Sequence, residues 1–383
     1  MAAVKLTIAQ PALAAGLAAV RPAVALRPPY GATDCCLLTA GEGELRLEAT
    51  DLTLGLARTV AADVREPGQA LVVGRVLDQI VRGLTGTLEL AATARRLDLA
   101  GEGRTAALVL TSPERFPPLP RPEETLTTLL AAELRAGITR VIHAVADEKA
   151  GRPALTGVCL DLDGATATLA AADGVRLAVA ACALVTPVAE PVRLVIPAPA
   201  PRALGPLLGA GEVVLSRTPN GTTVGARFQS DAGAALLCAQ LLQSQFPDYQ
   251  RLVPTRHTTR VSVGREDLAG ALRFLAVLGR ENAGCVRLQA LPANGQLVLT
   301  VQADEVGEQR VMLPAAVDGE PVKLALNHGL LRQAVAAIPH GPAAAAEPNG
   351  PVWLDVNGPQ QPAVLHGADE TGREVIMPLF VAW

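Results

Sequence analysis

The stretch Gly43-Glu-Leu-Arg-Leu-Glu-Ala-Thr-Asp51 has two related stretches further along the chain. They are Ala165-Thr-Ala-Thr-Leu-Ala-Ala-Ala-Asp173 and Gly295-Gln-Leu-Val-Leu-Thr-Val-Gln-Ala-Asp304. In each, apolar residues alternate with other residues and an aspartate follows, which is the pattern of a half-buried strand that enters a tight turn. The aspartates are 122 and 131 residues apart. This spacing predicts three copies of one folding unit.

A second pattern, a short β run followed by an amphipathic helix, recurs at nearly the same spacing. It begins at Leu71, Leu194 and Leu324, with offsets of 123 and 130 residues. A third repeated motif pairs Phe116-Pro-Pro-Leu119 with Phe246-Pro-Asp-Tyr249, 130 residues apart. Three independent features on one spacing indicate a threefold repeat.

Each repeat is predicted to contain a strand, a helix and three strands, and then the same order again. Antiparallel strands interrupted by single helices indicate an α+β fold, with the helices on one side of the sheets. Proline-rich segments near residues 121 and 254 predict three domains, 1–121, 122–254 and 255–383. In the first domain we expect strands at 4–8, 34–38, 45–50, 54–61 and 70–73, helices at 10–20 and 75–83, and three further strands.

Composition limits the classes of function. The chain has 383 residues, of which 50% are hydrophobic, 18% charged and 2% aromatic, and its net charge is −4. A protein that holds nucleic acid by counterion release usually carries a large positive surplus, so any DNA contact should be weak, local or geometric. We expect no signal peptide and no membrane span. The six cysteines and five histidines show no metal-ligand spacing, and the cysteines are interpreted as small core residues of a cytoplasmic protein.

Two other classes of protein fit the sequence poorly. The segments Gly41-Glu-Gly and Gly101-Glu-Gly are interpreted as hairpin turns rather than phosphate loops, because no helix follows them. Asp51 and Asp173, at equivalent positions, are expected to cap turns, so catalysis is not expected. A single-strand binding protein needs stacking aromatics among basic residues. The tryptophans and tyrosines are limited to Tyr30, Tyr249, Trp353 and Trp383.

Four segments give the chain a resemblance to the β subunit of bacterial DNA polymerase III, the DNA sliding clamp. They are Arg152-Pro-Ala-Leu-Thr-Gly-Val158, Ala171-Ala-Asp-Gly-Val-Arg-Leu-Ala178, Phe246-Pro-Asp-Tyr-Gln-Arg-Leu-Val-Pro254 and Val375-Ile-Met-Pro-Leu379. The resemblance covers essentially the whole chain. It implies three domains of the DNA-clamp fold, each with two helices lining a hole and antiparallel sheets outside, in a ring-shaped head-to-tail homodimer. It implies no catalysis and no cofactor.

The resemblance also implies what the ring binds. Its partners would be duplex DNA, encircled without sequence preference, the DNA polymerase III catalytic subunit, the clamp loader and other proteins with a clamp-binding motif. These proteins would insert a short peptide into a hydrophobic pocket between the second and third domains. The implied pocket residues are Leu155, Ala172, Gly174, Val175, Arg176, Leu177, Pro247, Arg251, Leu252, Asn327, Leu330, Pro362, Ile376, Met377 and Pro378. The implied DNA-binding residues are Arg27, Arg75, Arg82, Lys149, Arg152 and Arg202.

Several positions depart from the family pattern. Val175 stands where many members carry histidine, Leu330 where an aromatic residue is frequent, and Phe380 where a basic residue is common. Pro153 and Ala154 replace tyrosines that contact DNA in some members. These changes make the pocket more apolar and weaken the expected DNA contact. They leave open a specialised clamp paralogue that serves a repair polymerase or drug resistance.

Overall fold

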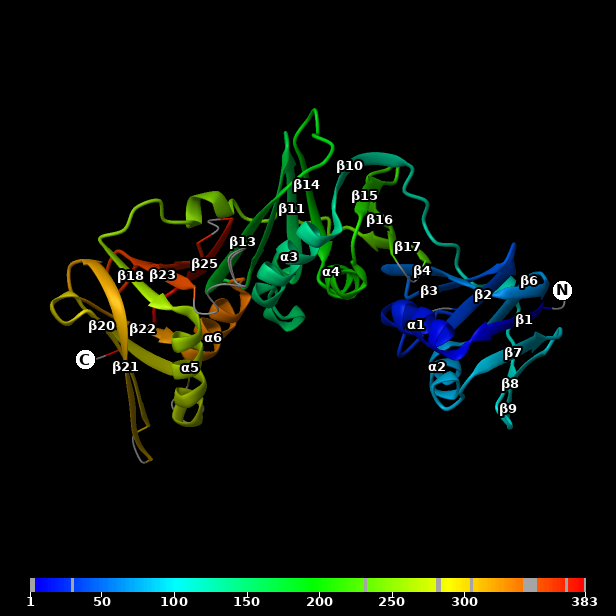
Figure 1. Ribbon diagram of the computed structural model, residues 1–383. Coiled ribbons are helices and arrows are strands. Elements are labelled where there is room, and N and C mark those ends of the chain that lie inside the picture. The colour runs from blue at the N-terminus through cyan, green and yellow to red at the C-terminus, as the bar shows by residue number, and fades with distance from the viewer. Residues whose placement is uncertain are drawn as a thin grey trace. The chain divides into compact units, whose positions relative to one another are not determined.

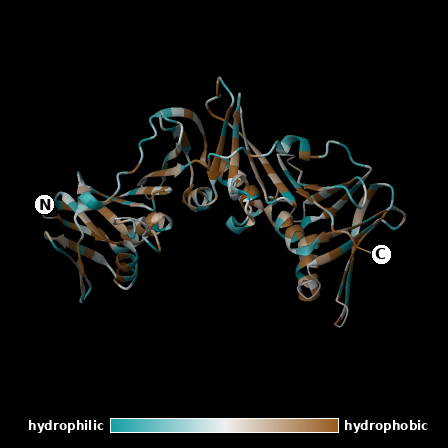
Figure 2. Cartoon of the chain, turned by 180° about the vertical axis from the view of Figure 1, so that it is seen from behind, coloured by the Kyte–Doolittle hydropathy of each residue, from teal (hydrophilic) through white to brown (hydrophobic). Residues whose placement is uncertain are grey.

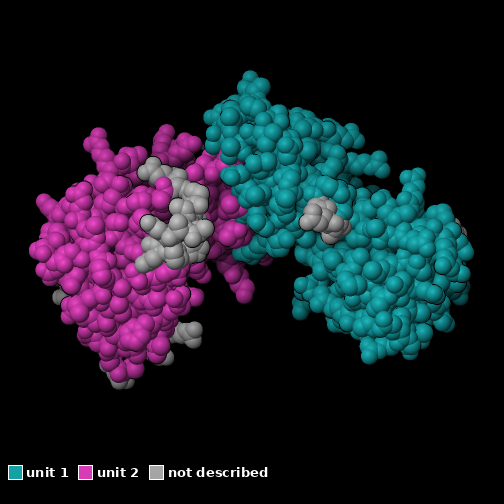
Figure 3. Space-filling view, in the orientation of Figure 1, with its two compact units in different colours: residues 1–135, 162–166, 183–242 teal, residues 136–161, 167–182, 243–383 magenta. Residues whose placement is uncertain are grey.

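The computed structural model of the chain describes residues 4–28, 31–230, 233–279, 284–303, 306–339, 350–368 and 371–381. Tyr30, Asp304 and Trp383 lie outside these ranges. The chain forms two compact units (Figure 3). Unit 1 comprises residues 1–135, 162–166 and 183–242, and unit 2 comprises residues 136–161, 167–182 and 243–383.

The first 109 residues have the predicted order of elements. The helix predicted at 10–20 is α1, whose bounds agree, and the helix predicted at 75–83 is α2, shifted by one residue. One strand, β5, was not predicted. The elements are β1 (Val4–Ala9), α1 (Gln10–Val20), β2 (Cys35–Gly41), β3 (Glu44–Thr50), β4 (Leu54–Ala61), β5 (Asp63–Glu66), β6 (Gly68–Val73), α2 (Gly74–Arg82), β7 (Thr87–Ala92), β8 (Arg96–Gly101) and β9 (Arg104–Val109).

The same order recurs twice further along the described chain, with no separate strand at the place of β5 (Figure 1). The second set is β10 (Glu124–Leu130), α3 (Ala131–Val141), β11 (Gly157–Asp163), β12 (Thr166–Ala172), β13 (Arg176–Ala183), β14 (Val192–Pro197), α4 (Pro199–Leu204), β15 (Glu212–Arg217), β16 (Thr223–Ser230) and β17 (Gly233–Gln240). The third is β18 (Thr259–Gly264), α5 (Arg265–Gly279), β19 (Cys285–Leu291), β20 (Gln296–Ala303), β21 (Gly307–Gly319), β22 (Val322–Asn327), α6 (His328–Ala337), β23 (Pro351–Val356), β24 (Ala363–His366) and β25 (Gly372–Ile376).

Sheets built from several segments of the chain hold each unit together. Unit 1 contains a sheet in the order β5-β1-β7-β8-β9 and a second in the order β10-β15-β16-β17-β4-β3-β2-β6. In unit 2 the strands run β11-β12-β13-β25-β24-β23-β18-β21-β20-β19-β22. All strand pairs with a described register are antiparallel, for instance Leu237 of β17 opposite Leu56 of β4 and Leu177 of β13 opposite Val375 of β25. The α+β class with antiparallel sheets is therefore confirmed.

Aspartates cap the turns after the repeated strands, as predicted. Asp51 Oδ1 accepts hydrogen bonds from the backbone nitrogens of Thr53 and Leu54, at 2.8 and 2.7 Å. Asp173 Oδ1 accepts from the nitrogens of Val175 and Arg176, both at 3.0 Å. These hydrogen bonds satisfy backbone donors that the turn would otherwise leave unpaired.

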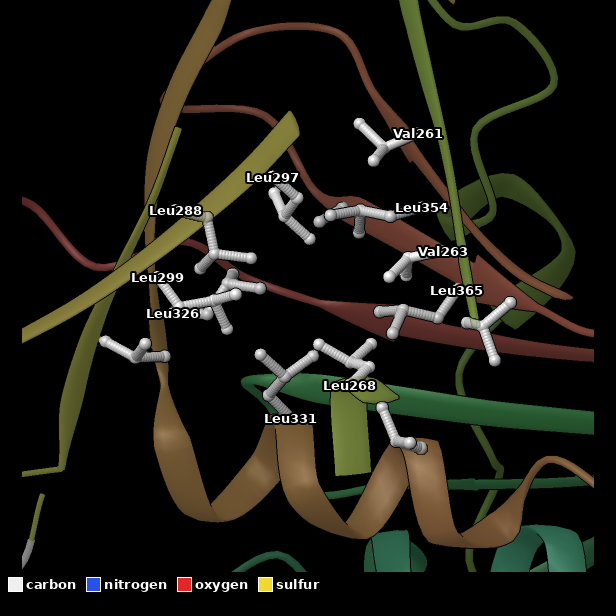
Figure 4. Packing of buried hydrophobic residues seen from close by; sticks show 14 of the residues in the cluster. Val261, Val263, Leu268, Leu288, Leu297, Leu299, Leu326, Leu331, Leu354 and Leu365 are labelled. Atoms are coloured by element: carbon white, nitrogen blue, oxygen red, sulfur yellow. The ribbon is translucent and has the colours of Figure 1, made fainter. Parts of the chain in front are cut away.

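The cores are aliphatic, because the sequence has few aromatic residues. In unit 2, Leu268 of α5 and Leu331 of α6 point toward the strand residues Leu326, Leu354 and Leu365, and all five are at least 97% buried (Figure 4). Hydrophobic segments occur along strands of both units (Figure 2). Helices that cover one face of a sheet bury their apolar side and leave their polar side to solvent.

Cysteines fill core positions in both units. Cys35 and Cys36, next to each other on β2, are both buried, and Cys35 packs in a cluster with Leu37, Leu71 and Phe116. Burial raises the pKa of each of these two thiols to about 12. A thiol with so high a pKa stays protonated and unreactive near neutral pH.

Candidate functional site

A largely apolar cavity of about 290 Å³ lies within unit 2. Its walls come from five parts of the chain: the segment around η5 (Pro153–Thr156), the end of β12 with the start of β13, the segment 246–252, Pro362 just before β24, and the strand β25 with its continuation. Ten of the fifteen residues expected to form a pocket line it. They are Leu155, Ala172, Gly174, Val175, Arg176, Leu177, Pro247, Leu252, Pro362 and Met377.

The alternation of β25 decides which of its side chains reach the cavity. Leu177 of β13 stands opposite Val375, and both line the cavity. Ile376, one residue further along β25, is 1% exposed and belongs to the hydrophobic core. Beyond the strand, the nitrogen of Met377 donates to the oxygen of Val175 at 2.9 Å, which holds Met377 against the turn before β13. Met377 remains 43% exposed at the cavity.

Two contacts fix the wall formed by residues 246–252. The Tyr249 hydroxyl donates to Asp161 Oδ2 at 2.7 Å, and the Tyr249 ring meets Phe246 edge-on with centroids 6.1 Å apart. Both aromatic side chains are buried, whereas Leu252 on the same wall is 52% exposed. An exposed leucine beside buried aromatic anchors gives an apolar surface that is rigidly supported and still open to a ligand.

Two arginines line this cavity. Arg176 is committed to its own unit: its Nε donates to Asp173 Oδ2 at 2.9 Å, and Nη1 donates to Gln333 Oε1 of α6. Arg152 is exposed and its guanidinium lies against Gly174, where a Cβ would collide with it. Gly174 has a φ of +98°, a left-handed backbone that favours glycine. A cavity with apolar walls and a few polar groups suits a short, mostly apolar segment of another chain.

The remaining five expected pocket residues do not line the cavity. The Arg251 side chain is 87% exposed and pairs with Asp248 at 2.8 Å. Asn327 caps α6, with its side chain accepting from the nitrogen of Leu330 at 3.1 Å. Leu330 packs on the core, Ile376 lies within it, and Pro378 is buried after β25.

Four residues that line the cavity were not expected to do so: Phe246, Tyr249, Val375 and Arg152. The first two belong to the repeated Phe-Pro motif, and Val375 belongs to the terminal motif, so the signal was present in the sequence. Arg152 was assigned to DNA instead.

The residues expected to bind DNA are all exposed. In unit 1, Arg75 and Arg82 lie on α2, Arg27 follows the 3₁₀ turn Arg21–Ala23, and Arg202 lies on α4. Arg82 pairs with Asp78 at 3.0 Å.

In unit 2, Lys149 lies in the 3₁₀ turn Glu148–Ala150 and Arg152 precedes η5. Within the described residues, no group of three or more His, Cys, Asp or Glu side chains is arranged to hold a metal ion. Of the helices described, none is both long and apolar enough to cross a membrane.

Solved structures define the class of fold. The chain superposes on the DNA polymerase sliding clamp from Bacillus subtilis with a TM-score of 0.88 and 20% identity, over 99% of this chain and all of that one. The clamp from Pseudomonas aeruginosa bound to griselimycin gives a TM-score of 0.87 and 23% identity, over 99% of this chain and all of that one. The fold is that of the DNA sliding clamps.

Sequence comparison identifies the family. Residues 4–119 match the N-terminal domain of the DNA polymerase III beta subunit, and residues 128–248 match its central domain. The beta sliding clamp of Synechococcus elongatus is 32% identical over 347 residues, 87% of this chain and 90% of the relative. The chain belongs to the DNA polymerase III beta subunit family.

Proposed function

We propose that this protein is a DNA sliding clamp: a ring of two copies that encircles duplex DNA and tethers a polymerase and other replication or repair proteins through the cavity of unit 2. Family membership supports the clamp itself. The cavity, with apolar walls and an open rim, is the observation that supports the tether. Three domains, 1–121, 122–254 and 255–383, would form each copy, and the two family matches fall inside the first two.

The strand pairing suggests how two copies close a ring. The third strand after the first helix of each repeat is β4, β13 or β21, and the third after the second helix is β9, β17 or β25. Within one chain, β4 pairs with β17 and β13 pairs with β25. The remaining members are β21 and β9: among the described strands, β9 pairs with β8, residues 307–314 of β21 pair with β20, and residues 315–319 of β21 pair with β18. Pairing β21 of one copy with β9 of the other would continue the pattern, and two such seams close a head-to-tail ring.

The same pattern predicts the register of the seam. Ala57 stands opposite Leu236 in the first pair and Val179 opposite Arg373 in the second. Ala57, Leu236 and Val179 are each the fourth residue of their strand. The fourth residues of β9 and β21 are Ala107 and Arg310, so we place these two opposite each other. The backbone supports this register, because Leu110 donates to Arg95 on the inner side of β9 and Ala315 donates to Gly295 on the inner side of β21. The amide groups of Ala107 and Arg310 therefore point outward from both edges.

A basic surface inside the ring would let the clamp slide without gripping DNA. We expect that changing Arg27→Ala together with Arg75→Ala shortens the residence of the clamp on closed circular DNA. The slope of the logarithm of affinity against the logarithm of salt concentration should fall by about one for each arginine removed. The protein's mass in solution should stay unchanged. The matched control is Arg95→Ala with Arg121→Ala, which removes the same charge from exposed positions outside this set. Equal losses in both variants would argue against an inner-face role.

The experiment that tests the proposed function measures the mass of the protein in solution and its retention on circular and on linear DNA. A clamp should have twice the chain mass of 39.5 kDa in solution. Once loaded, it should stay on nicked circular plasmid and leave the same plasmid after linearisation, because the ring slides off open ends. A particle of single mass, or one that stays equally on linear DNA, would overturn the proposal.

A further inference from the structure

A row of small residues crosses three strands of unit 1. Cys238 of β17 stands opposite Gly55 of β4 on one side and opposite Gly225 of β16 on the other. Residues that stand directly opposite each other share one face of a sheet. We call these three buried residues the glycine row. Because two of them have no side chain, another segment can lie very close to the backbone of the strands here.

Residues 116–122, here called the linker, contact the glycine row at both of its ends. A Cβ atom added at Gly55 would lie 2.7 Å from Cδ2 of Leu119. A Cβ atom added at Gly225 would collide with the ring of Pro122. Pro122 is buried and Leu119 is half-buried. These two apolar side chains therefore occupy the space that side chains at the two glycine positions would fill.

A hydrogen bond holds the linker at the middle of the row. The thiol of Cys238 donates to the backbone oxygen of Pro120 at 3.4 Å. The side chain of Arg121, the next linker residue, is exposed. The linker thus presents a leucine, a backbone acceptor and a proline ring to the sheet. Bound peptides are held in the same way, with backbone hydrogen bonds for affinity and small recesses for selected side chains.

The glycine row corresponds to part of the cavity wall in unit 2. In unit 1, the nitrogen of Gln240 donates to the oxygen of Thr53 at 2.8 Å, which joins the end of β17 to the turn before β4. The bond from Met377 to Val175 joins the end of β25 to the turn before β13 in the same way. The row positions that match, counted from these bonds and strand pairs, are Gly55 with Leu177, Cys238 with Val375 and Gly225 with Val364.

The size of the row residues accounts for the difference between the two surfaces. In unit 2, Leu177 and Val375 fill the space next to the strands and line the cavity, and the segment 246–252 forms a wall beside them. In unit 1, the matched positions carry glycine and cysteine, and the linker lies directly on the strands. An apolar segment of the chain thus covers in unit 1 the surface that is open in unit 2.

We propose that the glycine row is a further peptide-binding site, specific for an extended segment with a leucine and a proline three residues apart, and that the chain's own linker occupies it. One glycine admits the branched end of leucine, the other admits a proline ring, and the thiol donates to a backbone oxygen between them. A partner segment must compete with a linker whose attachment gives it a high effective concentration. The site goes beyond the proposed tether, because its ligand differs and it lies in the other unit.

The test measures binding of a free copy of the linker. The probe is a fluorescent heptapeptide with blocked ends and the sequence of residues 116–122. Leu119→Ser with Pro122→Ser keeps the length of the linker and removes both side chains that lie on the row. We expect this variant to bind the probe at least about tenfold more tightly than the unmodified chain, because its linker competes poorly. The control, Pro118→Ser with Arg121→Ser, changes two exposed linker residues and should match the unmodified chain.

Cys238 reports whether the probe lies on the row. It is 1% exposed, so a thiol reagent should modify it slowly in the unmodified chain and at least about tenfold faster after Leu119→Ser with Pro122→Ser. Probe at about ten times its Kd should slow that reaction about tenfold, with the modified residue identified by mass spectrometry. Gly225→Ala should expose Cys238 without protection by the probe, because the added Cβ takes the place of the proline ring.

Two further readouts show that the variants are folded. Cys36 is buried in unit 1 and should stay unmodified in every variant. For unit 2, a fluorescent hexapeptide with two leucines and a phenylalanine, blocked ends and no titrating side chain suits the cavity. All variants should bind this blocked hexapeptide as the unmodified chain does. Absence of hexapeptide binding to the unmodified chain would overturn the proposed tether and leave the glycine row untouched.

Three results would overturn the inference itself. Cys238 that stays unreactive after Leu119→Ser with Pro122→Ser would show that the linker does not close the row. Reactive Cys238 without a gain in probe binding would show that the open row holds no peptide. Protection by the probe in Gly225→Ala as strong as in the serine variant would place the probe on another surface.

Discussion

Replacing Ala107 by proline should convert the proposed ring of two copies into single subunits. Ala107 is exposed on β9, an edge strand, and its backbone N–H points away from β8. Proline is tolerated at such an edge within the monomer, but it removes a donor and brings its ring against the neighbouring strand. We expect each seam to lose about 3 kcal/mol, about a hundredfold in affinity. Sedimentation at micromolar concentration should then show 39.5 kDa particles.

The control for this variant lies on the other sheet edge of unit 1. β5 closes the opposite side of the same sheet, so Arg65→Pro tests whether any proline on an edge strand of this sheet disperses the ring. Ala107→Pro should leave the melting temperature of the separated subunit nearly unchanged. A dimer that survives Ala107→Pro with unaltered affinity would refute the β9–β21 seam. Dissociation by both prolines would show an unspecific effect.

Much of the fold could be predicted because the signals are local. The alternation in Gly43–Asp51 and its two counterparts, each followed by an aspartate, specifies strand and turn without reference to the rest of the chain. Gly74 at the start of α2 and Gly83 directly after it set that helix within one residue. β5 escaped prediction because Asp63–Glu66 is short, polar and largely exposed, and it becomes a strand only by pairing with β1. Such a pairing depends on tertiary contacts, which no local pattern contains.

Which residues line the cavity depends in part on strand register, which a sequence motif does not specify. The structure brings the motif residues on β12, β13 and the turn between them to one cavity wall, because a short segment places them together. On β25 the motif Val375-Ile-Met377 was recognised from the sequence. The motif does not specify which of its side chains face the cavity, so Ile376 was expected to line it and Val375 was not. Opposite Leu177, the register sends Val375 to the cavity and Ile376 to the core. Arg251 does not line the cavity, because its side chain on a 3₁₀ turn is exposed to solvent, where Asp248 pairs with it.

Replacing Leu252 by aspartate should nearly abolish peptide binding without unfolding the protein. Leu252 lines the cavity and is 52% exposed, so the substitution leaves the core intact. A docked peptide would cover this side chain with apolar groups. It would therefore lose an apolar contact and have to cover a charged carboxylate, which costs free energy of desolvation. We expect a loss of about 2–3 kcal/mol, about fiftyfold, in titrations with the blocked hexapeptide.

Gln250→Asp is the matched control, because Gln250 is exposed on the same 3₁₀ turn, Tyr249–Leu252, and does not line the cavity. It adds the same charge at nearly the same place, so it reports the long-range electrostatic effect alone. We expect its affinity to stay within about twofold at physiological salt, where charges beyond about 8 Å are screened. If Leu252→Asp binds the peptide as tightly as Gln250→Asp does, the peptide occupies another surface. If both variants lose affinity equally, the loss comes from the added negative charge. A peptide that contacts Leu252 should instead bind Leu252→Asp much more weakly than Gln250→Asp.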